Sequence, residues 1–121
     1  MMNWKQLRKS FLFAGRGLMI AWKEEQNFRI QICVAFFVIF FMFVFRVSRQ
    51  ESVILVFVIF SVLVLELLNS IFERFLDLLK PRLHRYVEVI KDAMAAAVLL
   101  AACGSLIIGA LIFWPYIKDF F

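Results

Sequence analysis

Several residue types that build soluble enzyme sites are scarce or missing in this chain. Of its 121 residues only two are cysteines, Cys33 and Cys103, and both lie inside apolar runs, so neither a disulfide nor a metal pair is predicted. There is one histidine, no Walker A glycine loop, no zinc-ligand spacing and no Ser-His-Asp set. The sequence therefore carries none of the common signatures of a P-loop nucleotide-binding protein, a zinc enzyme or a serine hydrolase.

Long polar stretches are scarce too, because 64% of the residues are hydrophobic and the mean hydropathy is +0.90. A chain this small and this apolar is typical of an integral membrane protein with a single domain. We therefore predict an all-α membrane domain over residues 1–121, with a surface helix at 1–27 and membrane helices at 28–45, 53–79 and 93–117. Pro81 should end the second membrane helix, because its nitrogen cannot donate to the helical ladder. Residues 80–92 then form a polar connection.

The N-terminal segment carries the pattern of an amphipathic helix. Apolar residues recur there mostly at three- and four-residue steps, with lysine and arginine between them: Trp4, Leu7, Phe11, Leu18 and Trp22. Such a basic helix is typical of the membrane interface, where its apolar face meets the acyl chains. A soluble cap helix would show a similar pattern, and that alternative stays open.

Basic residues are distributed unevenly along the chain. Residues 1–29 hold six lysines and arginines and residues 74–91 hold five, whereas residues 46–52 hold two and the C-terminal tail holds one. By the positive-inside rule, the N-terminus and the second basic segment face the cytoplasm. The net charge of +5 is therefore interpreted as an orientation signal and a contact with anionic lipid, and no nucleic-acid partner is predicted.

Four polar residues recur at helical spacing within the second predicted membrane helix: Glu66, Asn69, Glu73 and Asp77. At about 100° per residue they fall within an arc of roughly 60° on one face. An ionisable group at the bilayer centre costs about 2.5–3.5 kcal/mol on insertion scales, so acids retained on one stripe indicate a site. Other interpretations stay open: Glu66 as a protonated acid bonded to a neighbouring helix, Asp77 as a solvated residue, or the stripe as a proton or cation pathway.

Further polar residues are expected at a similar membrane depth. The acidic pair at 24–25 precedes the first membrane helix, and Lys91 and Asp92 open the third. Carboxylates without nitrogen or sulfur partners suit Mg²⁺, and a neighbouring lysine suits a polyphosphate. Glu66, surrounded by hydrocarbon, is the candidate general base, and Asn69 is placed to orient it or a substrate hydroxyl.

Three motifs resemble the prokaryotic diacylglycerol kinase family, which includes the undecaprenol kinases. The family signature E-x-x-N-[ST]-x-x-E…D resembles residues 66–73 followed by Asp77. Its K-D-x-x-[AGS]-[AG]-A-V segment resembles residues 91–98, and its E-x-x-F-R element resembles residues 25–29. The order and spacing of the motifs agree along nearly the whole chain, and His84 falls where the family often has histidine.

The resemblance implies a homotrimer of three-span subunits in the bacterial inner membrane, with active sites shared between subunits on the cytoplasmic side. It implies transfer of the γ-phosphate of ATP, with Mg²⁺, to the hydroxyl of a membrane lipid alcohol, either diacylglycerol or undecaprenol. By motif position, Glu66 is the catalytic base and Asn69 supports it and the lipid headgroup, with Ala95 near the lipid. Glu25 and Glu73 hold the metal. The implied ATP-binding set is Glu25, Glu73, Asp77, Arg82, Leu83, His84, Lys91 and Asp92.

The chain departs from the best-known enterobacterial pattern at three positions. Gln6 stands where that pattern has an arginine near the nucleotide, Phe13 replaces a tyrosine, and Ala95 replaces a serine near the lipid. The loop at residues 48–51 and the ending at residues 112–115 resemble the undecaprenol-kinase branch instead. These departures leave the choice of lipid open.

Overall fold

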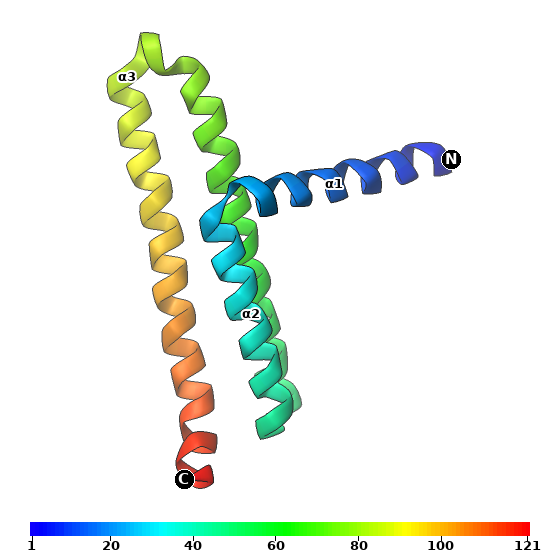
Figure 1. Ribbon diagram of the computed structural model, residues 1–121, viewed down its shortest axis with the longest axis vertical. Helices are drawn as coiled ribbons and strands as arrows, with labels where there is room; N and C mark the ends of the chain where they lie inside the picture. Colours follow the sequence, from blue (N-terminus) through cyan, green and yellow to red (C-terminus); the bar gives the residue numbers. More distant parts are fainter.

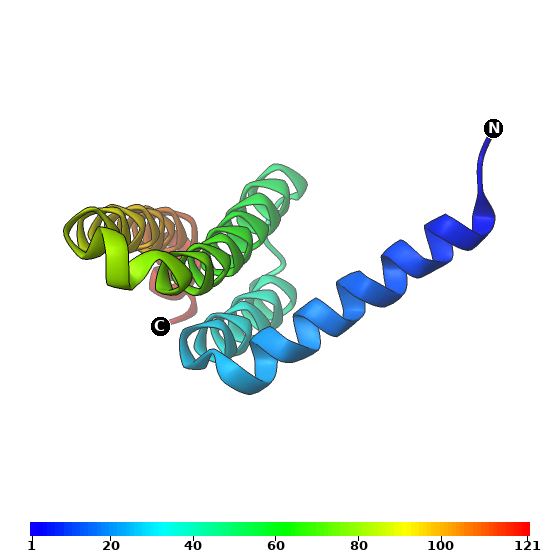
Figure 2. The same ribbon diagram turned by 90° about the horizontal axis from the view of Figure 1, so that it is seen from above.

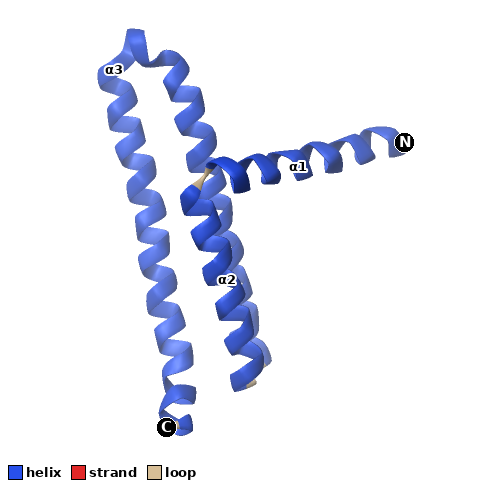
Figure 3. Cartoon of the chain, viewed as in Figure 1, coloured by secondary structure: helices blue, strands red, loops and turns tan.

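The computed structural model describes residues 1–121 as helices joined by short connections, with no strand. The helices are α1 (Trp4–Glu24), α2 (Gln26–Phe45) and α3 (Arg49–Phe120) (Figure 3). Figure 1 shows α2 running alongside α3, while α1 projects to one side of them. The prediction of an all-α fold is therefore confirmed, and α1 ends at Glu24, three residues before the end of the surface helix predicted at 1–27.

α1 stands apart from the other helices, as the view from above also shows (Figure 2). The Asn3 side chain caps it by accepting a hydrogen bond from the Gln6 backbone N–H at 3.3 Å. Ala21 is its one buried residue, whereas Trp4, Phe11 and Trp22 are all exposed. An apolar face without a protein partner suits a helix that lies on a lipid surface.

The joint between α1 and α2 is a single residue, Glu25, whose backbone is extended (φ −109°, ψ 106°). Its own N–H donates to the Ala21 carbonyl at 2.9 Å, which closes the last turn of α1. The Arg29 guanidinium reaches back and donates to the carbonyls of Trp22 (2.8 Å) and Lys23 (2.9 Å). Arg29 thus satisfies carbonyls that a helix end leaves free, and it fixes the angle at which α2 leaves α1.

α3 is folded back on itself at Leu83, whose φ and ψ (−121°, 36°) are not helical. We call residues 49–82 its first arm and residues 84–120 its second arm; Figure 1 shows them antiparallel and side by side. The prediction that Pro81 ends the helix is wrong, since helical structure continues through Pro81 and breaks two residues later. Proline removes the hydrogen bond to the Asp77 carbonyl and its ring crowds that carbonyl, but a helix can bend around these effects without ending at the proline itself.

Residues 80–92 are likewise helical on both sides of the reversal, where a polar connection was predicted. Two ion pairs join the arms here. Lys91 contacts Asp77 at 2.6 Å, and Lys80 lies 3.9 Å from Glu88. Because both pairs bridge the arms, the polar residues of this segment are part of the helical hairpin and do not form a loop.

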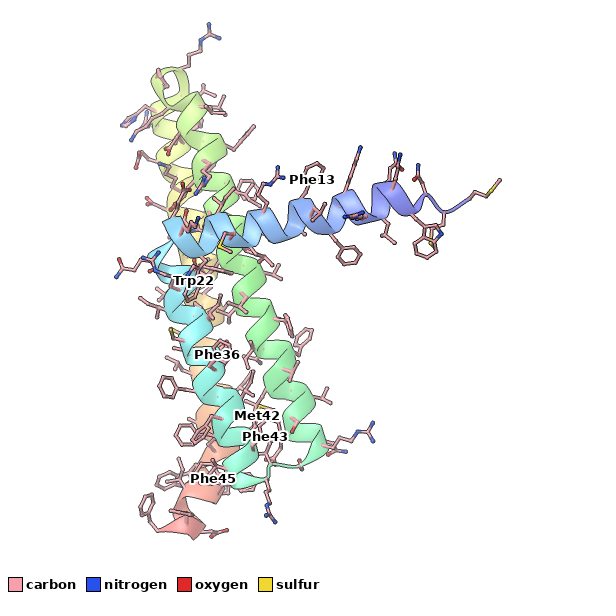
Figure 4. The ribbon with its side chains drawn as sticks, turned by 45° about the vertical axis from the view of Figure 1, so that its right-hand side comes forward. Phe13, Trp22, Phe36, Met42, Phe43 and Phe45 are labelled. Atoms are coloured by element: carbon pink, nitrogen blue, oxygen red, sulfur yellow. The ribbon has the colours of Figure 1, made fainter.

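At the opposite end, Phe45 of α2 packs against the last turns of α3, as its position in Figure 4 shows. Its ring centroid lies 6.1 Å from that of Phe113, 6.2 Å from that of Tyr116 and 6.1 Å from that of Phe120. The Tyr116 hydroxyl donates to the Glu51 carboxylate, which also accepts from the Ser48 backbone N–H in a capping box. These contacts tie the second arm of α3 to the α2–α3 connection.

Little of the apolar surface is covered by the chain itself. Nine residues are buried, and large side chains such as Phe36 and Phe43 are 69% and 78% exposed (Figure 4). α2 and α3 are both long and apolar enough to cross a membrane, with mean hydropathies of 2.4 and 2.6 in their most apolar stretches. Exposed hydrocarbon of this extent is compatible with a membrane protein, whose solvent is lipid.

Candidate active site

The polar stripe predicted from the sequence lies on the first arm of α3 and becomes more exposed toward the reversal. Glu66 is buried, with 5% of its surface exposed, and Asn69 is half-buried. Glu73 and Asp77 are exposed. The stripe therefore leads from a protected carboxylate to an accessible polar edge, which suits a site that must admit a charged substrate and keep water from the reacting group.

Glu66 lies within electrostatic reach of two other carboxylates, those of Glu25 at the α1–α2 joint and Glu73 on its own helix. The backbone at Glu66 is held in place from the next turn, since the buried Ser70 hydroxyl donates to the Glu66 carbonyl at 3.1 Å. The negative charges of Glu25 and Glu73 thus both act on Glu66, and like charges disfavour its ionised form.

Asn69 has a buried side-chain oxygen, Oδ1, that accepts no hydrogen bond within the chain. Leaving such an acceptor unpaired costs on the order of 1–3 kcal/mol. A hydroxyl or amide that enters the site would remove this cost by donating to Oδ1. The position one turn from Glu66 makes this oxygen a candidate contact for a substrate hydroxyl.

An ion-pair cluster holds the α1–α2 joint to α3. Arg74 Nη2 donates to Glu24, the last residue of α1, and contacts Glu25 Oε1 at 3.4 Å. The sequence motifs do not single out Arg74. Its position directly after Glu73, as the one basic residue between Glu66 and Asp77, is a pattern from which an ion pair near the acids could have been predicted.

A second ion pair connects residues that are far apart in the sequence. Lys91 Nζ donates to Asp77 Oδ1 at 2.6 Å, from the second arm to the first. The hydrogen bond from Lys91 to the Asp77 carboxylate raises the pKa of the Lys91 ammonium. Lys91 therefore carries its positive charge throughout the physiological pH range, at the exposed edge of the stripe where phosphate oxygens would be bound.

The remaining predicted residues lie outside this cluster. Arg82, Leu83 and His84 are at the reversal of α3, about 25 Å from Glu66 along the first arm. Asp92 and Ala95 are exposed on the second arm, and neither Asp92 nor His84 makes an ion pair within the chain. Within this chain Glu25 and Glu73 thus lie within electrostatic reach of Glu66, and Lys91 pairs with Asp77 farther along the first arm. The other nucleotide candidates lie at the tip of the hairpin or face outward.

The carboxylates fit a magnesium ion that is only partly held by protein. No three His, Cys, Asp or Glu side chains converge closely enough to enclose a metal. Mg²⁺ needs no such cage, because it keeps several waters and binds one or two carboxylates together with substrate phosphates. Glu25 and Glu73 supply hard oxygen donors of the right kind, and Oε2 of Glu25 makes no hydrogen bond within the chain.

Comparison with known proteins identifies the family of the chain. The profile of the prokaryotic diacylglycerol kinase family matches residues 12–113. The chain is similar to the undecaprenol kinase of Bacillus subtilis (strain 168), with 38% identity over 107 residues that cover 88% of this chain and 87% of that protein.

Two proteins named diacylglycerol kinase are also similar. The Synechocystis sp. protein is 32% identical over 107 residues, which cover 88% of this chain and 61% of that protein. The Helicobacter pylori (strain J99) protein is 30% identical over 115 residues, which cover 95% of this chain and 83% of that protein. The resemblance drawn from the three sequence motifs is confirmed, and the chain belongs to the prokaryotic diacylglycerol kinase family of lipid kinases.

Proposed function

We propose that this chain transfers the γ-phosphate of ATP to the hydroxyl of a membrane lipid alcohol, with diacylglycerol and undecaprenol as the candidate acceptors. The observation that carries the proposal is the position of Glu66. It is a buried carboxylate on the first arm of α3, within electrostatic reach of Glu25 and Glu73 and one turn from the unpaired oxygen of Asn69. A general base, an orienting amide and metal ligands are the groups that this reaction requires.

In the proposed reaction, the acceptor hydroxyl is the only hydrogen-bond donor that the lipid offers; it donates first to Asn69 Oδ1 as the lipid enters and then turns its proton to the Glu66 carboxylate. The Glu66 carboxylate takes the hydroxyl proton as the lipid oxygen attacks the γ-phosphorus, and ADP leaves on the opposite side. Lys91 offsets the negative charge that spreads over the phosphate oxygens. Glu25 and Glu73 would hold a magnesium ion, which would supply further positive charge to the phosphate groups. Such catalysis is mostly positioning and electrostatic stabilisation, which a small protein can provide.

The nucleotide approaches from the cytoplasm in this proposal. The exposed residues of the hairpin then face that side, and the basic residues around the reversal, such as Arg82 and His84, meet the charged and polar parts of ATP. This orientation follows the positive-inside distribution of lysine and arginine along the chain. It makes the protein a multi-pass component of the bacterial inner membrane, with α2 and both arms of α3 as its three spans.

The lipid tail has an apolar place to lie. A cavity of about 440 Å³ separates α2 from both arms of α3, and most of its lining is hydrophobic. Leu63, which lines it, is one helical turn from Glu66 on the first arm. A tail in this cavity puts its headgroup at the depth of the Glu66 carboxylate, which is the geometry that phosphorylation of a lipid hydroxyl needs.

We further propose that the active protein is a homotrimer whose sites are shared between subunits. Within one chain the Arg82–His84 stretch lies far from Glu66, and many large apolar side chains are exposed. A neighbouring copy would cover part of this surface and bring its own hairpin residues to the site. Crosslinking in native membranes, followed by separation by mass, measures the number of subunits directly.

Transfer of labelled phosphate from ATP tests the function. The purified chain in mixed micelles with Mg²⁺ is offered diacylglycerol and undecaprenol separately, and the labelled product is extracted into organic solvent. Preference for one lipid identifies the acceptor. Absence of transfer to both, from a sample that retains its helical circular dichroism, would contradict the kinase proposal; acid-dependent ion flux without ATP would then support the ion-pathway interpretation of the stripe.

A further inference from the structure

The ion-pair cluster at the α1–α2 joint contains one residue that the proposed mechanism does not use, Arg74. Its guanidinium comes from the first arm of α3, directly after Glu73, and Nη2 lies between two consecutive acids of the other element. Among the ion pairs of the chain, only those of Arg74 connect the joint to α3, since the other two bridge the arms of α3. Arg74 therefore links the two elements that carry the proposed metal ligands.

The joint needs such a link. Glu25 is the only non-helical residue between α1 and α2, and its side chain makes no capping hydrogen bond to α2. Its backbone N–H and the Arg29 guanidinium close the end of α1, but neither contact fixes the direction of the Glu25 carboxylate. Repulsion from the Glu66 carboxylate would turn that side chain away from the stripe unless a positive charge held it.

The two contacts of Arg74 differ in length and in the role of the acid that each one involves. The close contact is with Glu24, which is 57% exposed and has no part in the proposed metal site. The contact with Glu25 is longer, 3.4 Å, and uses Oε1, so Oε2 stays available to a metal. Glu24 thus anchors the guanidinium, and the guanidinium orients Glu25 without occupying both of its oxygens.

Stability alone does not explain this arrangement. The side chains of Arg74 and Glu24 are both about half exposed, and exposed ion pairs contribute little to folding free energy. A charge placed beside a metal ligand acts instead on where that ligand points and on how strongly the site holds its cation.

We propose that Arg74, anchored by Glu24, is a positioning residue that holds Glu25 toward Glu73 for the divalent metal of the kinase reaction. The inference rests on the proposed function, in which Glu25 and Glu73 hold that metal. It assigns to Arg74 no contact with the nucleotide or the lipid.

Two readouts test it on the full-length protein in mixed micelles. The first is the Mg²⁺ concentration at half-maximal phosphate transfer. The second, independent of activity, is Mn²⁺ binding in the presence of a non-hydrolysable ATP analogue, followed by electron paramagnetic resonance. Mn²⁺ takes the same oxygen ligands as Mg²⁺ and serves as the spin probe.

For Arg74→Ala, we expect both the half-maximal Mg²⁺ concentration and the Mn²⁺ dissociation constant to rise about tenfold, the scale on which outer partners of metal ligands act. The rate at saturating Mg²⁺ should largely recover. Arg74→Lys, which keeps the charge, should restore most of the metal affinity. Glu24→Gln should produce a smaller shift in the same direction, and it guards against a loss of fold at position 74. Lys118→Ala is the control, because it removes one exposed positive charge at the far end of α3.

The wild-type measurement separates the two proposals. Wild-type transfer that requires Mg²⁺, together with unchanged metal dependence and unchanged Mn²⁺ binding in Arg74→Ala and Glu24→Gln, would overturn the role of Arg74 and leave the kinase proposal intact. Lack of transfer by the wild type would overturn the kinase proposal, and with it the role of Arg74 in that reaction.

Discussion

Replacement of Glu66 by glutamine is the most direct test of the proposed chemistry. The two side chains have nearly the same volume, so the substitution leaves no cavity at a position where only 5% of the residue surface is exposed. Glutamine cannot take a proton from a lipid hydroxyl. It also removes a charge that lies near the carboxylates of Glu25 and Glu73, and this relieves repulsion. The variant should therefore fold at least as well as the wild type.

The expected loss is in the catalytic rate. A positioned general base contributes about 10²- to 10⁴-fold, which corresponds to about 2.7–5.5 kcal/mol of barrier at 1.36 kcal/mol per tenfold. Because Glu66 is shielded from solvent, bulk water is poorly placed to act as a substitute base. We therefore expect a loss toward the upper end of that range. The Mg²⁺ concentration at half-maximal activity should change little, since the metal ligands remain.

The assay measures kcat and KM for ATP in mixed micelles at saturating Mg²⁺, alongside thermal unfolding in the same detergent. Glu88→Gln is the matched control, because it makes the same chemical change on the second arm, at a side chain that is 48% exposed. Glu66→Gln activity within about tenfold of wild type, in a variant that melts normally, would refute Glu66 as the general base.

Three further outcomes follow from the contacts described. Glu73→Gln should raise the half-maximal Mg²⁺ concentration about tenfold or more, and an Mg²⁺ titration unchanged from wild type would remove Glu73 from the metal site. Hydrogen bonds from Tyr116, and then from the Ser48 backbone, lower the pKa of the Glu51 carboxyl below its ordinary value of 4.5, so the folded state binds fewer protons than the unfolded state there. This stabilisation is present above pH 4.5 and is lost as the pH falls through the lowered pKa. Tyr116→Phe should therefore flatten the dependence of the melting temperature on pH below pH 4.5. A melting temperature that falls with pH as steeply as that of wild type would contradict the contact. Arg46 has a positive φ of 52°, which glycine adopts more easily than a residue with a side chain. Arg46→Gly should therefore raise the free energy of unfolding by up to about 1 kcal/mol, and Arg46→Val should lower it. The opposite order of stability in a denaturant titration would be inconsistent with that backbone conformation.

Much of the fold could be predicted from local pattern. The amphipathic period over residues 4–23 and the apolar run that ends at Phe45 correspond closely to α1 and α2. The connection before α3 also follows local rules, since Ser48 and Glu51 form a capping box. These features depend on residues within one or two turns of each other, and such spacings can be read directly from the sequence.

The position of the reversal could not be predicted as well. Proline is the strongest local signal for a helix end, yet the break falls at Leu83 and the polar residues beyond it are helical. The pairs Lys91–Asp77 and Lys80–Glu88 join the arms across this break. Contacts between the arms depend on where the chain turns, so they are not available to an argument that treats each segment alone.

For the candidate site, sequence spacing placed Glu66, Asn69, Glu73 and Asp77 on one helix face, because a period of 3.6 residues alone determines which side chains share a face. The expected membrane depth of polar residues added Glu25 and Lys91, and the family motifs implied their roles. The tertiary structure decided which other elements meet that face. It brings Lys91 onto Asp77 through the reversal at Leu83, and it brings Arg74 onto Glu24 and Glu25 through the packing of the α1–α2 joint. Helical periodicity determines which side chains share one face of a single helix. Which faces of two helices meet depends on where and at what angle the helices cross, and many residues far apart in the sequence determine this together.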